Sequence, residues 1–132
     1  MPKDLRTFMD LVERKDPSGF RQVRREVNPE FETSAVLRKL QHRVEYPLVH
    51  FEKVKGLDLS IVSNVIADNK KLALTLDVSE ENLLKSFVER EANPIPPKIV
   101  KDGPVKERIY TGNDVDLNML PWPVQCEKDG GA

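Results

Sequence analysis

The chain has 132 residues, a length that fits one domain with a core large enough to fold without disulfides or metals. Hydrophobic residues make up 39% and charged residues 33%, as in an ordinary globular protein. Because 21 Lys and Arg residues balance 22 Asp and Glu residues, the net charge gives no electrostatic reason to expect nucleic acid or anionic lipid as a partner.

The first predicted element is a helix in the stretch DLRTFMDLVERK, which places four apolar side chains at i, i+3, i+4 and i+7 on one face. Asp4 is the expected N-cap, since its carboxylate can accept hydrogen bonds from unpaired amides of the first turn. The turn sequence DPSG at 16–19 ends this helix. The following GFRQVRREV predicts a strand with a basic exposed side.

A second helix is predicted in TSAVLRKLQHRV, after a break at Pro29. Thr33 or Ser34 can cap it. Its expected apolar stripe consists of Val36, Leu37, Leu40 and Val44.

Residues 48–66 have the strongest β signal in the chain. Two β-rich runs, 48–54 and 57–66, flank Lys55 and Gly56. Gly56 readily supplies the positive φ of a tight connection, so these runs predict a hairpin.

Two more helices are expected after the hairpin. The first is short, over residues 69–76, and has Leu72, Ala73 and Leu76 as its apolar residues. The second follows Ser79 as its N-cap, in SEENLLKSFVERE, where two glutamates complement the positive end of the helix dipole. Its apolar residues, expected to face inward, are Leu83, Leu84, Phe87 and Val88.

The character of the chain changes after residue 92. Six of the ten prolines lie in the remainder, where only one strand is predicted, at 105–110. We therefore expect an α+β fold, in which helices cover a small mixed sheet with a hairpin over residues 1–92, and a Pro-rich connector over 93–132 that lies against something else. The predicted core consists of Leu5, Phe8, Leu37, Leu40, Val49, Phe51, Ile61, Leu84 and Phe87.

No residues are predicted as catalytic, cofactor-binding or metal-binding. The two histidines, His42 and His50, have no Cys or acidic residue at metal-ligand spacing, so we interpret them as a surface and a sheet histidine. Cys126 is the single cysteine, which excludes an internal disulfide and fits a reducing, cytoplasmic environment. A reactive thiol is the less favoured interpretation of Cys126, because no neighbouring motif indicates thiolate activation.

Other functional motifs are missing from the sequence as well. No glycine-rich phosphate loop and no G-x-S-x-G nucleophile motif occur. The basic clusters RQVRRE and RKLQHR are interrupted by other residues and lack interleaved aromatics, so a solvated face is favoured over a nucleic-acid site. No apolar run reaches the length of a membrane span, and the N-terminus lacks an apolar signal-peptide core.

Four stretches, in order along nearly the whole chain, resemble one enzyme family. DLRTFMDLVER is similar to a D-L-R-x-F-[LI] opening, and FRQVRREVNPEFETSAVLRKL fills the place of the next strand and helix. YPLVHFEKVKG is similar to P-A-[LV]-x-F-E-x-V-K-G and is the most specific match, while DVDLNMLPWP is similar to V-D-L-x-x-L-P-[IW]-P. These are motifs of the UbiD family of decarboxylases.

The resemblance implies that the chain is the N-terminal domain of a longer enzyme. Such enzymes decarboxylate, some reversibly, aromatic or α,β-unsaturated acids with prenylated FMN, a divalent metal (usually Mn2+) and K+. The implied partners are the remainder of the same polypeptide, a split-barrel cofactor domain and a C-terminal domain, in a parent that forms a homo-oligomer. The family's metal ligands and its Glu-Arg-Glu set correspond to no position in this sequence, so the chain alone is expected to be inactive.

Two departures leave the substrate class open. IADNKKLALTL stands where many members have a Gly- and Arg-rich turn, and ANPIPPKIVKDGPVKE is only loosely similar to the family. The alternative hypothesis is a stand-alone interaction or regulatory subunit that docks through its Pro-rich tail. A small catalytic domain in its own right is the least favoured possibility, because no catalytic set is present.

Overall fold

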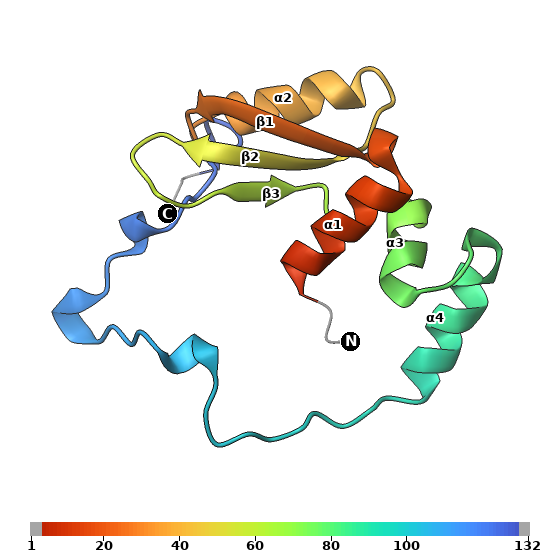
Figure 1. Ribbon diagram of the computed structural model, residues 1–132. Helices are drawn as coiled ribbons and strands as arrows, with labels where there is room; N and C mark the ends of the chain where they lie inside the picture. The colour runs from red at the N-terminus through yellow and green to blue at the C-terminus, as the bar shows by residue number, and fades with distance from the viewer. Residues whose placement is uncertain (1–3, 130–132) are drawn as a thin grey trace.

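A computed structural model describes residues 4–129 and contains a three-stranded mixed sheet (Figure 1). The strand order is β1 (Phe20–Val27), β2 (Leu48–Val54) and β3 (Ile61–Ser63). The central strand β2 is parallel to β1 and antiparallel to β3. Helix α2 (Glu32–Gln41) makes the crossover from β1 to β2, as a parallel pair requires. The expected α+β fold is confirmed.

The predicted hairpin is formed by β2 and β3, but its second strand is shorter than expected. Gly56 has a φ of 79°, and the Leu57 amide donates to the Val54 carbonyl at 3.1 Å. This tight turn closes the end of β2, and the chain pairs with it again only at Ile61. Three residues of β3 pair with β2, in place of the ten-residue run at 57–66.

The core lies between one face of the sheet and α2. Val27, Val49, Phe51, Val54 and Ile61 form a buried cluster. The half-buried residues packed against this cluster are Val23, Val36, Leu37, Leu40 and Leu57. The predicted core is therefore confirmed for the sheet residues and for the inner face of α2.

Helix α1 (Leu5–Lys15) begins as predicted. The Thr7 amide donates to the Asp4 carboxylate at 2.9 Å, and the Thr7 side chain reaches back to the Asp4 backbone in a capping box. Val12 is fully buried and Phe8 half-buried, but Leu5 is exposed in the first turn. The prediction of Leu5 as a core residue is wrong.

Helix α2 differs from the prediction at both ends. Phe31, with a φ of 64°, occupies the N-cap position, and neither Thr33 nor Ser34 caps the helix. Thr33 is instead buried inside the first turn. The helix ends at Gln41, so Val44 falls beyond it, in a left-handed conformation and exposed to solvent.

Of the last two helices, the first agrees with its prediction, and the second exposes side chains that were expected to face inward. Helix α3 (Asn69–Leu76) has the predicted bounds and buries Ala73. Helix α4 (Leu83–Ala92) follows a 3-10 turn, Glu80–Asn82, that begins after Ser79 without a side-chain cap. Only Leu83 of its apolar residues is buried; the exposed fractions are 75% for Leu84, 49% for Phe87 and 54% for Val88. The expectation that these three residues face inward is wrong.

The segment after α4 runs in a wide arc away from the sheet and returns to it near its end (Figure 1). It contains three short 3-10 turns, Pro104–Lys106, Gly112–Asp114 and Leu117–Met119. The predicted strand at 105–110 is wrong: a 3-10 turn overlaps its start, and no strand among residues 4–129 pairs with this stretch. Within residues 4–129, no helix has both the length and the apolar composition needed to cross a membrane.

Candidate functional site

The end of the connector is attached to the β1–α2 junction. The Phe31 amide donates to the Val124 carbonyl at 2.9 Å, and the Val124 amide donates to the Pro29 carbonyl at 3.2 Å. These bonds make an isolated parallel bridge between Glu30 and Val124. Phe31 occupies the N-cap position in a left-handed conformation, and its apolar side chain has no acceptor for the amides of the first turn, so α2 starts without a side-chain cap.

Trp122 lies beside this attachment point. Its indole Nε1–H donates to the Leu117 carbonyl at 2.8 Å, so the polar edge of the ring is satisfied within the connector. A groove of about 320 Å3 is lined by the ring and by the turn at Gly56 and Leu57. The ring remains half-exposed. Trp122 thus faces its own domain across this groove, and the expectation that the connector lies against another part of the protein stays a prediction.

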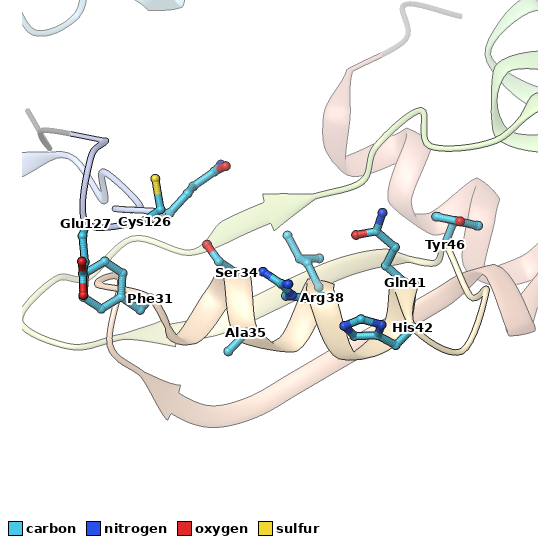
Figure 2. A pocket seen from close by; sticks show the side chains of 11 residues that line it. Phe31, Ser34, Ala35, Arg38, Gln41, His42, Tyr46, Cys126 and Glu127 are labelled. Atoms are coloured by element: carbon cyan, nitrogen blue, oxygen red, sulfur yellow. The ribbon is translucent and has the colours of Figure 1, made fainter.

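A larger groove, of about 1030 Å3, follows the outer face of α2. Figure 2 shows Cys126 and Glu127 of the connector at the Phe31 end of this groove, and His42 and Tyr46 at the other end. The structure therefore places Cys126 and His42 in one groove, which sequence reasoning did not anticipate. They lie at opposite ends of α2, so they do not form a Cys–His pair of the kind that activates a thiol.

His50 lines a separate groove, of about 710 Å3, between α1 and the face of the sheet opposite α2. This face is polar: the Gln22 amide contacts the Glu52 carboxylate across β1 and β2, and His50 lies half-buried beside them. Asp4, Asp10 and Glu13 of α1 line the same groove. The interpretation of His50 as a sheet histidine and of His42 as a surface histidine agrees with these positions.

Two buried charges join α3 to the rest of the domain. Asp16, at the end of α1, accepts from Ser18 at 2.8 Å and pairs with Lys70 at 2.9 Å. Lys71 is fully buried, where its ammonium group contacts the Asp68 carboxylate and donates to the Tyr46 carbonyl at 2.8 Å. Both lysines therefore have a structural role. The pair between Lys70 and Asp16 joins residues more than fifty positions apart, so no local pattern in the sequence predicts it.

The pKa values of the acidic groups reflect these contacts. The hydrogen bond from Lys70, and then that from Ser18, lowers the pKa of Asp16 against the opposing effect of burial. The Asn28 amide, which donates to the Glu32 carboxylate at 2.6 Å, lowers the pKa of Glu32. Asp16 also raises the pKa of Lys70. These carboxylates are held ionised by structural partners, which is unlike a general acid or base near neutral pH.

The described residues do not suit a flavin phosphate or a catalytic metal. Residues 4–129 contain no group of three or more His, Cys, Asp or Glu side chains that could hold a metal ion. The N-termini of α1 and α3 are occupied by Asp4 and Asp68, and Glu80 and Glu81 precede α4. Negative side chains at a helix start take the place that a phosphate would need.

Comparison with known proteins assigns this fold to a class. Residues 13–91, more than half of the chain, match the family of the 3-octaprenyl-4-hydroxybenzoate carboxy-lyase N-terminal domain. The chain belongs to this family, the N-terminal domain of UbiD-type carboxy-lyases. The family suggested by the sequence motifs is thereby confirmed.

Named relatives are decarboxylases. The chain is 34% identical to a phenolic acid decarboxylase of Sedimentibacter hydroxybenzoicus, over 98% of this chain and 28% of the relative. It is 28% identical to a pyrrole-2-carboxylic acid decarboxylase of Pseudomonas aeruginosa, over 97% of this chain and 28% of the relative. The chain therefore spans just over a quarter of the length of these relatives.

Solved structures of the same class share the fold. The dimeric evolved UbiD-class enzyme HmfF of Pelotomaculum thermopropionicum, in complex with prFMN, superposes with a TM-score of 0.79 at 30% identity, covering 92% of this chain and 28% of HmfF. The vanillic acid decarboxylase of Sedimentibacter hydroxybenzoicus, in closed form, gives a TM-score of 0.77 at 31% identity, covering 97% and 28%. Flavin complexes are thus known for neighbours of this fold.

Proposed function

We propose that this chain serves as the N-terminal domain of a UbiD-class decarboxylase, in which the cofactor and the acid substrate bind to parts of a longer polypeptide outside residues 1–132. The observation that supports this most directly is the extent of the match. Relatives that are decarboxylases align with 97–98% of this chain, yet with only 28% of their own length.

The proposed division of the chain follows the sequence prediction. Residues 1–92 form the N-terminal α+β domain, and residues 93–132 connect it to a split-barrel domain that binds the cofactor. Prenylated FMN, with Mn2+ and K+, is the proposed cofactor set of the parent enzyme. Residues 4–129 lack a suitable phosphate or metal site, which supports placing this cofactor set elsewhere in the longer polypeptide.

The proposed substrate is an aromatic or α,β-unsaturated carboxylic acid. The named relatives act on a phenolic acid and on pyrrole-2-carboxylic acid, which are both aromatic acids. Nothing in the grooves over α2 or beside α1 selects among such acids. We therefore propose a structural role for this chain: it supports and orients the domain that binds the cofactor.

The test compares this chain with the full product of its gene. Each is purified and mixed with prenylated FMN, Mn2+ and K+, and with vanillate, 3,4-dihydroxybenzoate or pyrrole-2-carboxylate. Flavin absorbance retained on the protein and CO2 release are measured against a cofactor-only control. We expect both signals from the gene product and neither from the 132-residue chain. Turnover by the chain alone would contradict the proposal, as would an inactive gene product that ends at Ala132.

A further inference from the structure

The outer face of α4 has the composition of an interface but no partner within the described chain. Leu84, Phe87 and Val88 are spaced i, i+3 and i+4, which puts them on one side of the helix, and about half or more of each side chain is exposed. Leu83, at the edge of the same apolar stripe, is buried, and α4 packs chiefly on α3. An amphipathic helix normally turns its apolar side inward, whereas α4 leaves most of its apolar side uncovered in this domain.

The connector that follows α4 also exposes apolar side chains. The connector leaves directly from the end of α4 and sweeps away from the sheet (Figure 1). Ile95 and Ile99 are each 92% exposed, and Val105 is similarly uncovered. Between residues 94 and 116, the hydrogen bonds join residues no more than five positions apart, and every residue except Gly103 is exposed, so the described part of the chain leaves this arc largely uncovered.

We propose that the α4 face, defined as Leu84, Phe87 and Val88, together with the adjoining connector, is the surface on which the rest of the same polypeptide docks. This inference rests on the proposed function, because it needs a polypeptide longer than the described chain. The relatives supply the length: 28% coverage leaves most of their sequence available as the occupant.

The position of the connector supports an occupant from the same polypeptide. The connector starts at α4 and is attached again at Val124, at the opposite end of the domain (Figure 1). A domain that follows in the sequence is therefore tethered close to this domain. Tethering raises its effective concentration, so even a modest apolar surface is sufficient for stable docking.

The size of the α4 face argues against the alternative of two copies of this chain. Three side chains of this size, about half-exposed, offer roughly 300 Å2. A stable interface between separate proteins buries about 800 Å2 on each partner. The α4 face is thus too small to hold an untethered second copy but sufficient as one part of an interface between domains.

The experiment measures whether the α4 face is covered in the gene product. Cys126, which is exposed, is replaced by Ser, and a single cysteine is introduced by Phe87→Cys or, as a control, by Glu89→Cys. Glu89 is exposed on the same helix but lies off the α4 face. Labelling by a maleimide is followed by mass spectrometry of the peptide that contains the introduced cysteine, in the 132-residue chain and in the full gene product.

We expect the two positions to react within about threefold of each other in the chain, and Phe87→Cys to react at least tenfold more slowly than Glu89→Cys in the gene product. Equal rates in the gene product would overturn the proposal. Slow labelling of Phe87→Cys in the chain, accompanied by a dimer in sedimentation, would overturn it in favour of a second copy.

Two further measurements test the docking surface, one without any substitution and one that separates it from the proposed function. Hydrogen exchange of the unsubstituted proteins should show the α4 amides protected at least tenfold more in the gene product than in the chain, and equal protection would overturn the proposal. Decarboxylation by the unsubstituted gene product is assayed in parallel. An active enzyme with a freely reactive Phe87→Cys would refute the docking surface alone, whereas an inactive enzyme with a protected position would refute only the proposed function.

Discussion

The sheet with α2 and the region from α4 onward use similar apolar residues in opposite ways. In the first region, Val49, Phe51 and Ile61 are buried between β-strands and a helix. In the second, Phe87 and the isoleucines of the connector are turned to solvent. Helical or strand periodicity tells which side chains share a face, but the direction of that face depends on which layers the molecule contains.

The largest expected difference between the two regions lies in their phenylalanines. Phe51 has 0% exposure and Phe87 has 49%. We expect Phe51→Ala to lower the free energy of unfolding by about 3–5 kcal/mol, because it removes a fully buried ring and leaves a cavity. Chemical denaturation of the 132-residue chain, followed by circular dichroism, measures this loss.

Phe87→Ala is the matched control in the same chain. About half of the Phe87 surface is already exposed, so we expect a smaller loss, of about 1–2 kcal/mol. Equal losses for the two variants would show that α4 packs against the domain in solution and would remove the contrast between the regions.

The elements that sequence reasoning predicted correctly are those set by local signals. The N-cap at Asp4, the bounds of α3 and the positive φ at Gly56 all depend on residues within a few positions of each other. Two of the buried positions of β2, Val49 and Phe51, were also predicted, because β-branched and aromatic residues of a central strand have little choice of environment.

What the sequence could not predict depends on contacts between distant segments. Phe31 stands at the N-cap of α2 in place of Thr33 or Ser34, and its amide donates to Val124, which lies more than ninety positions away. The predicted stretch at 105–110 has suitable residues for a strand but no neighbour to pair with. The groove along α2 also depends on distant segments, since Cys126 lines it together with His42 only because the connector is attached at the β1–α2 junction.

A second test concerns the joint between α1 and β1. A Cβ atom at Gly19 would overlap the Asp16 carboxylate, which Ser18 and Lys70 hold in place. We expect Gly19→Ala to displace this carboxylate and lower stability by about 1–2 kcal/mol, after the smaller gain from a stiffer unfolded chain. Thermal unfolding followed by circular dichroism measures the effect.

Gly103→Ala is the control in the connector. Gly103 has an extended backbone with a φ of −167°, and nothing lies within 4 Å of an added Cβ atom. We expect no loss of stability. A lower unfolding temperature for this variant would show that the connector is packed more closely than its exposure indicates.

A third test uses pH to isolate Asp16. Because its pKa is lowered in the folded state, the ion pair with Lys70 stabilises the fold above the unfolded-state pKa, near the ordinary value of 3.8. This stabilisation is lost as the pH falls through the folded-state value. We expect Asp16→Asn to cost about 1 kcal/mol at pH 7 and progressively less below about pH 4.

Denaturation curves at several pH values measure this dependence. Asp10→Asn provides the comparison, since Asp10 is exposed on the same helix. A cost for Asp16→Asn that stays constant from pH 7 to pH 3 would show that the carboxylate acts through shape and packing rather than through its charge.

The smallest expected effect on stability tests the attachment of the connector. Val124→Pro removes the amide that donates to the Pro29 carbonyl, while Val124→Ala keeps both backbone bonds to the junction. We expect either variant to lower the free energy of global unfolding by less than about 1 kcal/mol, because the bridge lies outside the core.

The two variants should differ locally, in the position and accessibility of the connector. In Val124→Pro, Trp122 should move away from the turn at Gly56, shifting its emission to longer wavelength, and proteolysis within residues 93–129 should become faster. Because Trp122 is the only tryptophan, its emission reports on this site alone. Emission and proteolysis equal to those of Val124→Ala would show that the bridge does not hold the connector in solution, so that the region from α4 onward would be joined to the domain only at α4.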